Sequence, residues 1–313
     1  MKSFKVYAAT LLAITFWGLS FIWSNRLVQQ GIPVEYFLPI RIFIAACILL
    51  VINIVMGYSM KIHRRDFLTF LMLAVCEPFI YFFCETYGIQ FTGSPTISSL
   101  VIASTPVVAL VAGVVFFKEH IGWQHIVGMA ICLAGLILVT EAQKSTSRLF
   151  VFGIIVLVLA VFAEVGYAVF TKALSGGYKP TVIVMYQFFI GSIFFLPLFL
   201  TRGMENYVDE VYNSWELFWK PLLCLAVLCS TLAFTMWAYA IQGLGVAKSS
   251  VFQALNPVIT ALAGFVLGDE VLCGWQWIGL VVAVGGVILT QLDFGSKALF
   301  GGSSVPEPPT EPR

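Results

Sequence analysis

The sequence predicts an all-α membrane protein, with ten transmembrane helices arranged as two inverted five-helix repeats. Three observations lead to this prediction: the composition, ten long apolar segments and an internal repeat. Hydrophobic residues make up 60% of the 313 positions and charged residues only 11%, whereas about a quarter of the residues in a soluble domain are charged. Lipid is therefore the expected solvent for most of the chain.

Ten apolar segments are separated by glycine, proline, asparagine and charged residues. Each is about 20 residues long, the length that a helix needs to cross a hydrocarbon layer roughly 30 Å thick. Helices are expected because backbone groups that face lipid must bond within their own segment. The predicted spans are residues 6–28, 35–56, 67–88, 94–117, 122–141, 149–174, 180–201, 217–242, 246–268 and 273–292.

The positive charges predict the orientation of these spans, because lysine and arginine favour cytoplasmic loops. With the N-terminus inside, eleven of the 17 lysines and arginines fall in inner segments and five in outer ones, and Arg41 lies within the second span. Both termini are therefore predicted to be cytoplasmic. We also expect an amphipathic interfacial helix between Arg202 and Lys220, and a disordered cytoplasmic tail over residues 296–313.

An internal repeat appears when the chain is compared with itself at an offset of 151 residues. Each of the two predicted repeats, residues 6–141 and 149–292, holds five spans, so the second enters the membrane from the opposite side. Inverted repeats can open a midplane site alternately to each side, which predicts transport of a small molecule across the bilayer. The matching positions are Ser98-Ser99, Pro106-Val107, Gly113 and Glu119 with Ser249-Ser250, Pro257-Val258, Gly264 and Glu270.

Three motifs give the chain a family resemblance. Trp17-Gly18-x-Ser20-Phe21, Arg41-Ile42-Phe43 and the doubled Pro-Val, with a glutamate thirteen residues after each proline, resemble the EamA-type transporters of the drug/metabolite transporter superfamily. The resemblance implies a ten-helix exporter of amino acids or related metabolites in a bacterial cytoplasmic (inner) membrane. It also implies a cavity lined by the third, fourth, eighth and ninth helices. One departure is that Thr105 and Asn256 stand before the prolines, where the family often has an acid.

Ionisable side chains within the spans are the first candidates for substrate binding or coupling. A charge at the bilayer centre costs roughly 2.5 to 3.5 kcal/mol on insertion scales, so such residues are usually functional. Glu77 and Glu164 fall near the midplane, and Arg41 and Glu85 lie toward the outer side. An Arg41–Glu85 ion pair is a purely structural alternative. Reversible protonation of the midplane acids makes protons a candidate coupling ligand.

Aromatic and polar residues at similar depth complete the set of candidate site residues. Aromatic residues at helical spacing are usually packing, but polar groups that converge from two halves suit a small polar or zwitterionic ligand. These further candidates are Trp17, Tyr81, Ser104, Gln253 and Asn256.

Two prolines, Pro106 and Pro257, fall in the middle of the fourth and ninth spans. Each removes one backbone hydrogen bond and frees the carbonyl four residues earlier, that of Ile102 or Gln253. Such a carbonyl can bind substrate or simply accompany a bend. We predict that both prolines are hinges.

Other classes of protein receive little support from the sequence. The chain has no HExxH, Gly-x-Ser-x-Gly or Gly-rich phosphate loop, so we predict neither an enzyme nor a bound cofactor. His63, His120 and His125 show no metal-ligand spacing. A net charge of +1 offers no basic face for nucleic acid. The alternatives left open are a nucleoside or nucleotide-sugar carrier of the same superfamily, and a non-transporting membrane scaffold.

Overall fold

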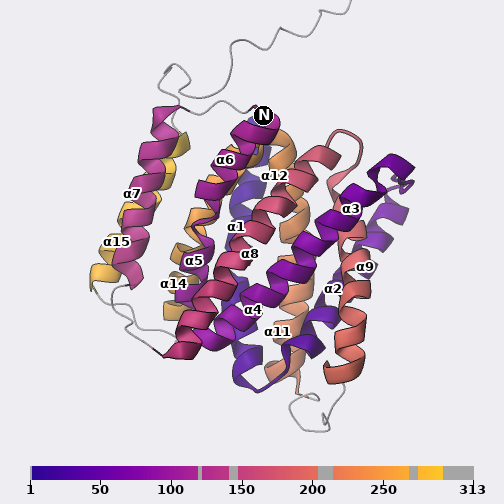
Figure 1. Cartoon of the computed structure of the whole chain (residues 1–313), viewed down its shortest axis with the longest axis horizontal. Helices are drawn as coiled ribbons and strands as arrows, with labels where there is room; N and C mark the ends of the chain where they lie inside the picture. The colour runs from indigo at the N-terminus through magenta and orange to yellow at the C-terminus, as the bar shows by residue number, and fades with distance from the viewer. Residues whose placement is uncertain (1, 119–121, 141–146, 204–213, 268–273, 292–313) are drawn as a thin grey trace, which may run out of the picture.

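A computed structural model of the chain describes residues 2–118, 122–140, 147–203, 214–267 and 274–291. Every regular element in these residues is a helix, and the helices form one bundle (Figure 1). Their apolar lengths make this an integral membrane protein. Seven helical stretches are long and apolar enough to cross a membrane: Phe4–Gln29, Val34–Val55, Arg64–Thr92, Arg148–Leu174, Pro180–Thr201, Trp215–Leu244 and Val246–Leu267.

The first half of the chain forms helices whose ends follow local signals. Gly93 has a φ of 65° and ends one helix, and the next begins at Pro95, where the Ser94 hydroxyl accepts the Ile97 N–H at 3.3 Å. Proline at a first helical position loses no hydrogen bond. The elements are α1 (Lys2–Gln29), α2 (Val34–Val55), η1 (Arg64–Asp66), α3 (Phe67–Ala74), η2 (Val75–Ile80), α4 (Tyr81–Thr92), α5 (Pro95–Ile102), α6 (Thr105–Phe117) and α7 (Trp123–Thr140).

The second half uses the same kinds of helix boundary. The Ser147 hydroxyl accepts the Phe150 N–H at 3.1 Å and so caps the long helix that follows, and Pro180 begins another. The elements are α8 (Arg148–Leu174), α9 (Pro180–Leu198), η3 (Phe199–Gly203), η4 (Trp215–Trp219), α11 (Lys220–Leu223), η5 (Cys224–Ala233), α12 (Phe234–Leu244), α13 (Val246–Ser250), η6 (Val251–Leu255), α14 (Asn256–Leu267) and α15 (Gly274–Gln291).

The three remaining predicted spans, residues 94–117, 122–141 and 273–292, coincide with α5 and α6, with α7 and with α15. That these helices also cross the membrane, and the total of ten, stay predictions. Most of the expected amphipathic segment falls on residues 204–213, and the expected tail on residues 292–313, both outside the described residues.

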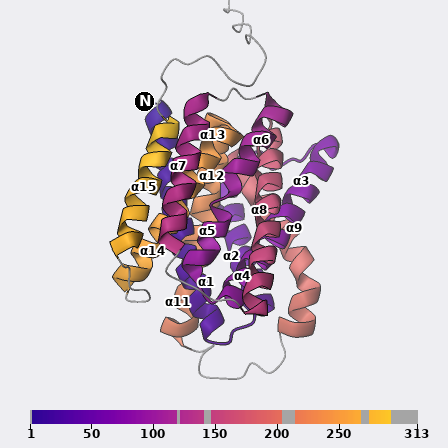
Figure 2. The same ribbon diagram turned by 60° about the vertical axis from the view of Figure 1, so that its left-hand side comes forward.

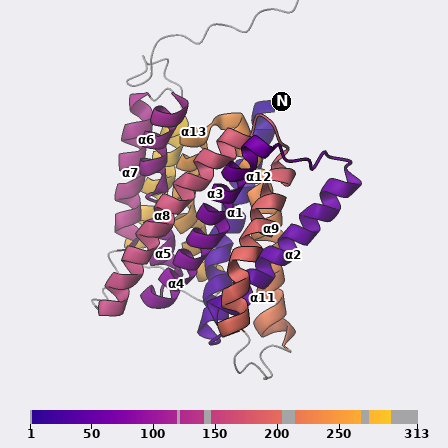
Figure 3. The ribbon, with the colours of Figure 1, turned by 45° about the vertical axis from the view of Figure 1, so that its right-hand side comes forward.

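Helix packing pairs each half of the chain with the other. α2 packs against α9, α7 against α15, α4 against α8, and α1 against α12. The α7–α15 pair lies along one edge of the bundle in Figures 1 and 2, and α9 contacts both α2 and α3 at the opposite edge (Figure 3). Two related halves would produce these pairings, although the inversion itself stays a prediction. The start of α1 and the end of α15 lie at the same end of the bundle (Figure 2).

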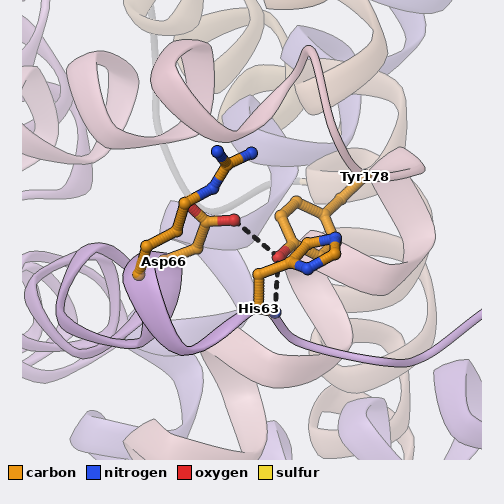
Figure 4. Close-up of polar contacts among 4 residues, drawn as sticks. His63, Asp66 and Tyr178 are labelled. Carbon is orange, nitrogen blue, oxygen red and sulfur yellow. Dashed lines mark hydrogen bonds and ion pairs between the residues drawn. The ribbon is translucent and has the colours of Figure 1, made fainter.

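A polar cluster joins the two halves at one end of the bundle (Figure 4). The Tyr178 hydroxyl donates to Asp66 Oδ2 at 2.8 Å and accepts the backbone N–H of His63 at 3.0 Å, and Gln242 donates to the Tyr178 carbonyl at 3.3 Å. Desolvation, and then the neighbouring Asp66, raise the pKa of Tyr178, so the phenol keeps its proton and continues to donate. This cluster lies on the predicted cytoplasmic side.

Candidate functional site

A small cavity lies between the helices near the middle of the bundle. The space open to the centre of a water-sized sphere is about 10 Å³, which is room for roughly one water molecule. Four helices of the first half and two of the second contribute to it. The lining residues are Trp17, Ser20, Phe21, Arg41, Glu77, Tyr81, Phe82, Glu85, Glu164 and Phe234.

A break in the third predicted span brings Glu77 to this cavity. Glu77 has an extended backbone (φ −148°, ψ 121°) inside an otherwise helical stretch, and it is followed by Pro78 through a cis peptide bond. Gly191 of α9 packs directly on this break, because a Cβ at that position would lie 2.3 Å from the Pro78 ring. Close approach of α9 to the break therefore requires glycine.

Arg41 is fully buried on α2 and reaches across to the second half. Its Nε donates to Ser230 Oγ at 2.8 Å, and its guanidinium carbon lies 4.3 Å from the centroid of the Phe82 ring. Nη1 has no hydrogen-bond partner in the protein. The possible Arg41–Glu85 ion pair is not formed between these two described residues, because Arg41 bonds to a hydroxyl and an aromatic face instead. Both residues nevertheless line the cavity.

Three buried carboxyl groups share the cavity with this single guanidinium. Glu77 is 2% exposed and its Oε2 has no hydrogen-bond partner in the protein, and Glu85 is 3% exposed. Glu164 differs because both of its oxygens are engaged. Oε2 accepts the Thr105 hydroxyl at 3.1 Å, and Oε1 accepts the side-chain amide of Gln253. Among the residues that line the cavity, Arg41 Nη1 and Glu77 Oε2 are therefore fully buried charged-group atoms without a hydrogen-bond partner in the protein.

Aromatic rings form much of the rest of the wall. The Trp17 ring lies 5.0 Å from Phe234 and 5.0 Å from Trp237, and Phe82 lies 5.7 Å from Phe234. Trp17 Nε1 donates to the Cys229 carbonyl at 3.3 Å. These contacts hold α1 and α4 against the start of α12, so the rings serve packing and also face the cavity.

The structure separates the predicted site residues into two groups. Trp17, Tyr81, Arg41, Glu77, Glu85 and Glu164 meet at the cavity, whereas Ser104, Gln253 and Asn256 do not line it. The Ser104 hydroxyl is used within its own turn, at 2.7 Å from the Val101 carbonyl. Gln253 reaches the cavity only through Glu164, and Asn256 is buried with a side-chain oxygen that has no protein partner.

Sequence reasoning missed several residues at the cavity. Ser20 and Phe21 belong to the same motif as Trp17, one helical turn along α1, so their spacing could have indicated a shared face. Glu77, Tyr81 and Glu85, which the sequence analysis did identify, are also four residues apart, a spacing that indicates a shared face. No local pattern indicated Phe82 and Phe234, which line the cavity. The same holds for Ser230, which packing between distant segments brings to Arg41. In the described residues no group of three or more His, Cys, Asp or Glu side chains could hold a metal ion.

Both predicted hinges lie where the regular α-helical geometry changes. A turn at Ala103 and Ser104 separates α5 from α6, and the 3₁₀ segment η6 precedes α14. The Thr105 hydroxyl donates to the freed Ile102 carbonyl at 2.6 Å, and the backbone N–H of Asn256 bonds to the freed Gln253 carbonyl. Both carbonyls are therefore bonded inside the protein, and the hinge role of the two prolines stays a prediction.

Replacing Pro106 or Pro257 with alanine should slow transport severalfold and leave equilibrium ligand binding nearly unchanged. The alanine N–H can complete the helical ladder, which stiffens the break and slows exchange between conformations. Initial rates in proteoliposomes and ligand affinity in detergent measure the two effects. Pro197→Ala, in the last turn of α9, is the matched control. An equal loss of affinity and rate would place the prolines in the binding site.

Comparisons with known proteins give the family of this chain and its fold. The model of the EamA-like transporter family matches residues 4–141 and again residues 151–292. The chain is 24% identical to the uncharacterized transporter YetK of Bacillus subtilis (strain 168), over 93% of this chain and 88% of that protein. A solved crystal structure shares the fold, with a TM-score of 0.75 at 16% identity, over 91% of this chain and 96% of that one.

Two further relatives have more specific names. A probable terminal-alkyne amino-acid exporter of Streptantibioticus cattleyicolor is 29% identical over 61% of this chain and 62% of its own length. A probable amino-acid metabolite efflux pump of Salmonella typhimurium is 21% identical over 91% of this chain and 94% of its own length. The resemblance of the sequence motifs is confirmed by the family match over both halves: the chain belongs to the EamA-like transporter family.

Proposed function

We propose that this transporter exports amino acids or closely related zwitterions by alternating access. The observation that supports this most directly is the pair of unpartnered groups at the cavity, Arg41 Nη1 and Glu77 Oε2. A buried polar group without a partner is costly, and a buried charge more so. A zwitterion would pair with both groups at once, its carboxylate with Arg41 and its ammonium with Glu77.

The size of the cavity supports the alternating-access part of the proposal. Room for about one water cannot hold an amino acid, so substrate entry needs movement of the surrounding helices. The proline breaks in α5–α6 and η6–α14 are places where two helices of opposite halves can bend. In this proposal the chain lies in a bacterial cytoplasmic membrane with both termini inside, and one outward opening releases the substrate.

The charges at the cavity disfavour the alternative substrates. A nucleotide sugar carries phosphate charges that need several cationic groups, whereas this cavity has one guanidinium and three carboxyl groups. A nucleoside carries no charge to pair with Arg41. A membrane scaffold would leave two buried atoms without a partner, Arg41 Nη1 and Glu77 Oε2, without an explanation.

A ligand panel on the full-length protein tests the proposal. Thermal shift in detergent should show stabilisation by neutral amino acids, since a ligand that binds only the folded state raises its stability. Counterflow in proteoliposomes should then show exchange of the stabilising amino acids. Nucleosides and nucleotide sugars serve as the matched negative set. Counterflow of nucleotide sugars but not of amino acids would refute the proposal.

A further inference from the structure

Glu164 is in contact with both of the helices that carry a proline break. It faces the cavity from α8, yet its two oxygens bond to Thr105, beside Pro106, and to Gln253, four residues before Pro257. Thr105 is 1% exposed and Gln253 is 1% exposed, so water does not compete for these bonds. One carboxyl group of the cavity is therefore hydrogen-bonded to a residue beside each of the two places where bending is expected.

The Thr105 hydroxyl has two acceptors and only one proton to give. It lies 2.6 Å from the Ile102 carbonyl, which Pro106 has deprived of its helical N–H donor, and 3.1 Å from Glu164 Oε2. A hydroxyl donates one hydrogen bond and accepts up to two. Thr105 can therefore give a full-strength hydrogen bond to Ile102 or to Glu164, and a proton shared between the two acceptors weakens both bonds.

The charge of Glu164 decides how this conflict is resolved. When the carboxyl is protonated on Oε2, it donates to Thr105 Oγ1, Thr105 donates to the Ile102 carbonyl, and Gln253 donates to Oε1. Each donor in this series then has an acceptor, and Gln253 Oε1 is the atom left without a partner in the protein. When Glu164 is ionised, both of its oxygens are acceptors, and charge-assisted bonds are the stronger ones. The Thr105 proton is then drawn toward Glu164 and the Ile102 carbonyl loses its donor.

We infer that Thr105 is a positioning residue through which the protonation of Glu164 controls the α5–α6 break. A protonated Glu164 holds the break closed, and an ionised Glu164 loosens it. The corresponding break in the second half has no such connection, because the Gln253 carbonyl is bonded by the backbone N–H of Asn256. Gln253 donates to Glu164 in either state. The two halves should therefore respond differently to pH.

Other titratable groups surround Glu164 and set the pH at which it changes state. Glu77 on η2, Tyr81 and Glu85 on α4, Arg41 on α2 and Tyr167 on its own helix α8 all lie near it. The side-chain hydrogen bonds of Thr105 go to Ile102 and Glu164, so substituting the four residues on the other helices can move the pH midpoint but cannot replace the hydroxyl connection.

This inference rests on the proposed function in one respect: the proposed function gives the α5–α6 break its role in transport. The test of this inference uses no substrate. A negative result in the ligand panel would therefore not contradict the inference, and a negative result in this test would not contradict the proposed substrate.

Hydrogen–deuterium exchange of the full-length protein in detergent, followed by mass spectrometry, measures the opening of each break. Labelling times are scaled to the intrinsic exchange rate at each pH. Peptides covering residues 97–108 should exchange on the order of fivefold faster at high pH than at low pH, the size expected for one hydrogen bond. Peptides covering residues 248–259 should show no such change, which provides an internal control.

Variants separate the connection from a general effect on folding. Thr105→Val should remove the pH response of residues 97–108, Thr105→Ser should keep it, and Glu164→Gln should fix the break in its slow-exchanging form at every pH. Thr10→Val deletes a buried hydroxyl that bonds only to the Val6 carbonyl and should show the same pH response as the wild-type protein. If Thr105→Val disturbs folding, Thr105→Ser and Glu164→Gln still decide the outcome. A full pH response in Glu164→Gln or in Thr105→Val, or an equal response in both halves, would overturn the inference.

Discussion

Replacing Arg41 with methionine should weaken the binding of neutral amino acids by at least about thirtyfold, because truncating one member of a buried charge pair costs 2 kcal/mol or more. Methionine keeps most of the side-chain volume and removes the group that would hold the substrate carboxylate. Affinity from thermal shift, and counterflow in proteoliposomes, measure the loss. Arg41→Lys should recover only part of it, since an ammonium cannot reproduce the planar guanidinium.

The control for this prediction removes Ser230, the hydrogen-bond partner of Arg41, and leaves the charge of Arg41 in place. Ser230→Ala deletes the hydroxyl that accepts from Arg41 Nε at 2.8 Å, so it should reduce affinity much less than Arg41→Met. The thermal unfolding of the ligand-free variants shows whether either change affects the fold. Unchanged amino-acid affinity in a folded Arg41→Met protein would remove Arg41 from the binding site.

Glutamine at Glu77 and at Glu164 should have two different large effects. Glu77 has a free oxygen at the cavity, so Glu77→Gln should weaken the binding of substrates with an ammonium group by roughly ten- to a hundredfold, as for a hydrogen bond to a charged group. Analogues that lack the amine should bind as before. Glu164 is bonded within the protein, so Glu164→Gln should instead abolish the response of substrate flux to an imposed pH gradient while exchange continues.

Proteoliposomes with and without a pH gradient, loaded with an amino acid or its deaminated analogue, distinguish these two outcomes. Glu35→Gln is the matched control, because Glu35 is buried and bonded to the Tyr87 hydroxyl at 2.5 Å but does not line the cavity. Glu35→Gln should change neither the affinity for amino acids nor the response of substrate flux to the pH gradient. If the double variant at Glu77 and Glu164 also changes neither affinity nor pH response, both acids are structural.

The sequence by itself determined the helical segments and their limits. Predicted spans such as 149–174 and 246–268 agree closely with α8 (Arg148–Leu174) and with the stretch Val246–Leu267. The physical reason is local: lipid requires about 20 apolar residues in helical form, and glycine, proline and charges mark the ends. The family was also readable from short motifs, because they lie at fixed spacing along the chain.

Only the tertiary structure decided which polar groups meet. Their depth in the predicted spans identified Glu77, Glu164, Arg41 and Glu85 as candidates. Depth alone, however, cannot say which face of a helix turns inward or which neighbour a side chain meets. Ser230 therefore replaced Glu85 as the partner of Arg41, and the Ser104 hydroxyl stayed within its own turn. Thr105, noted in the sequence only as a departure from the family, proved to bond to Glu164 across 59 residues. Contacts of this kind depend on how α6 and α8 pack, and no periodicity within either helix specifies that packing.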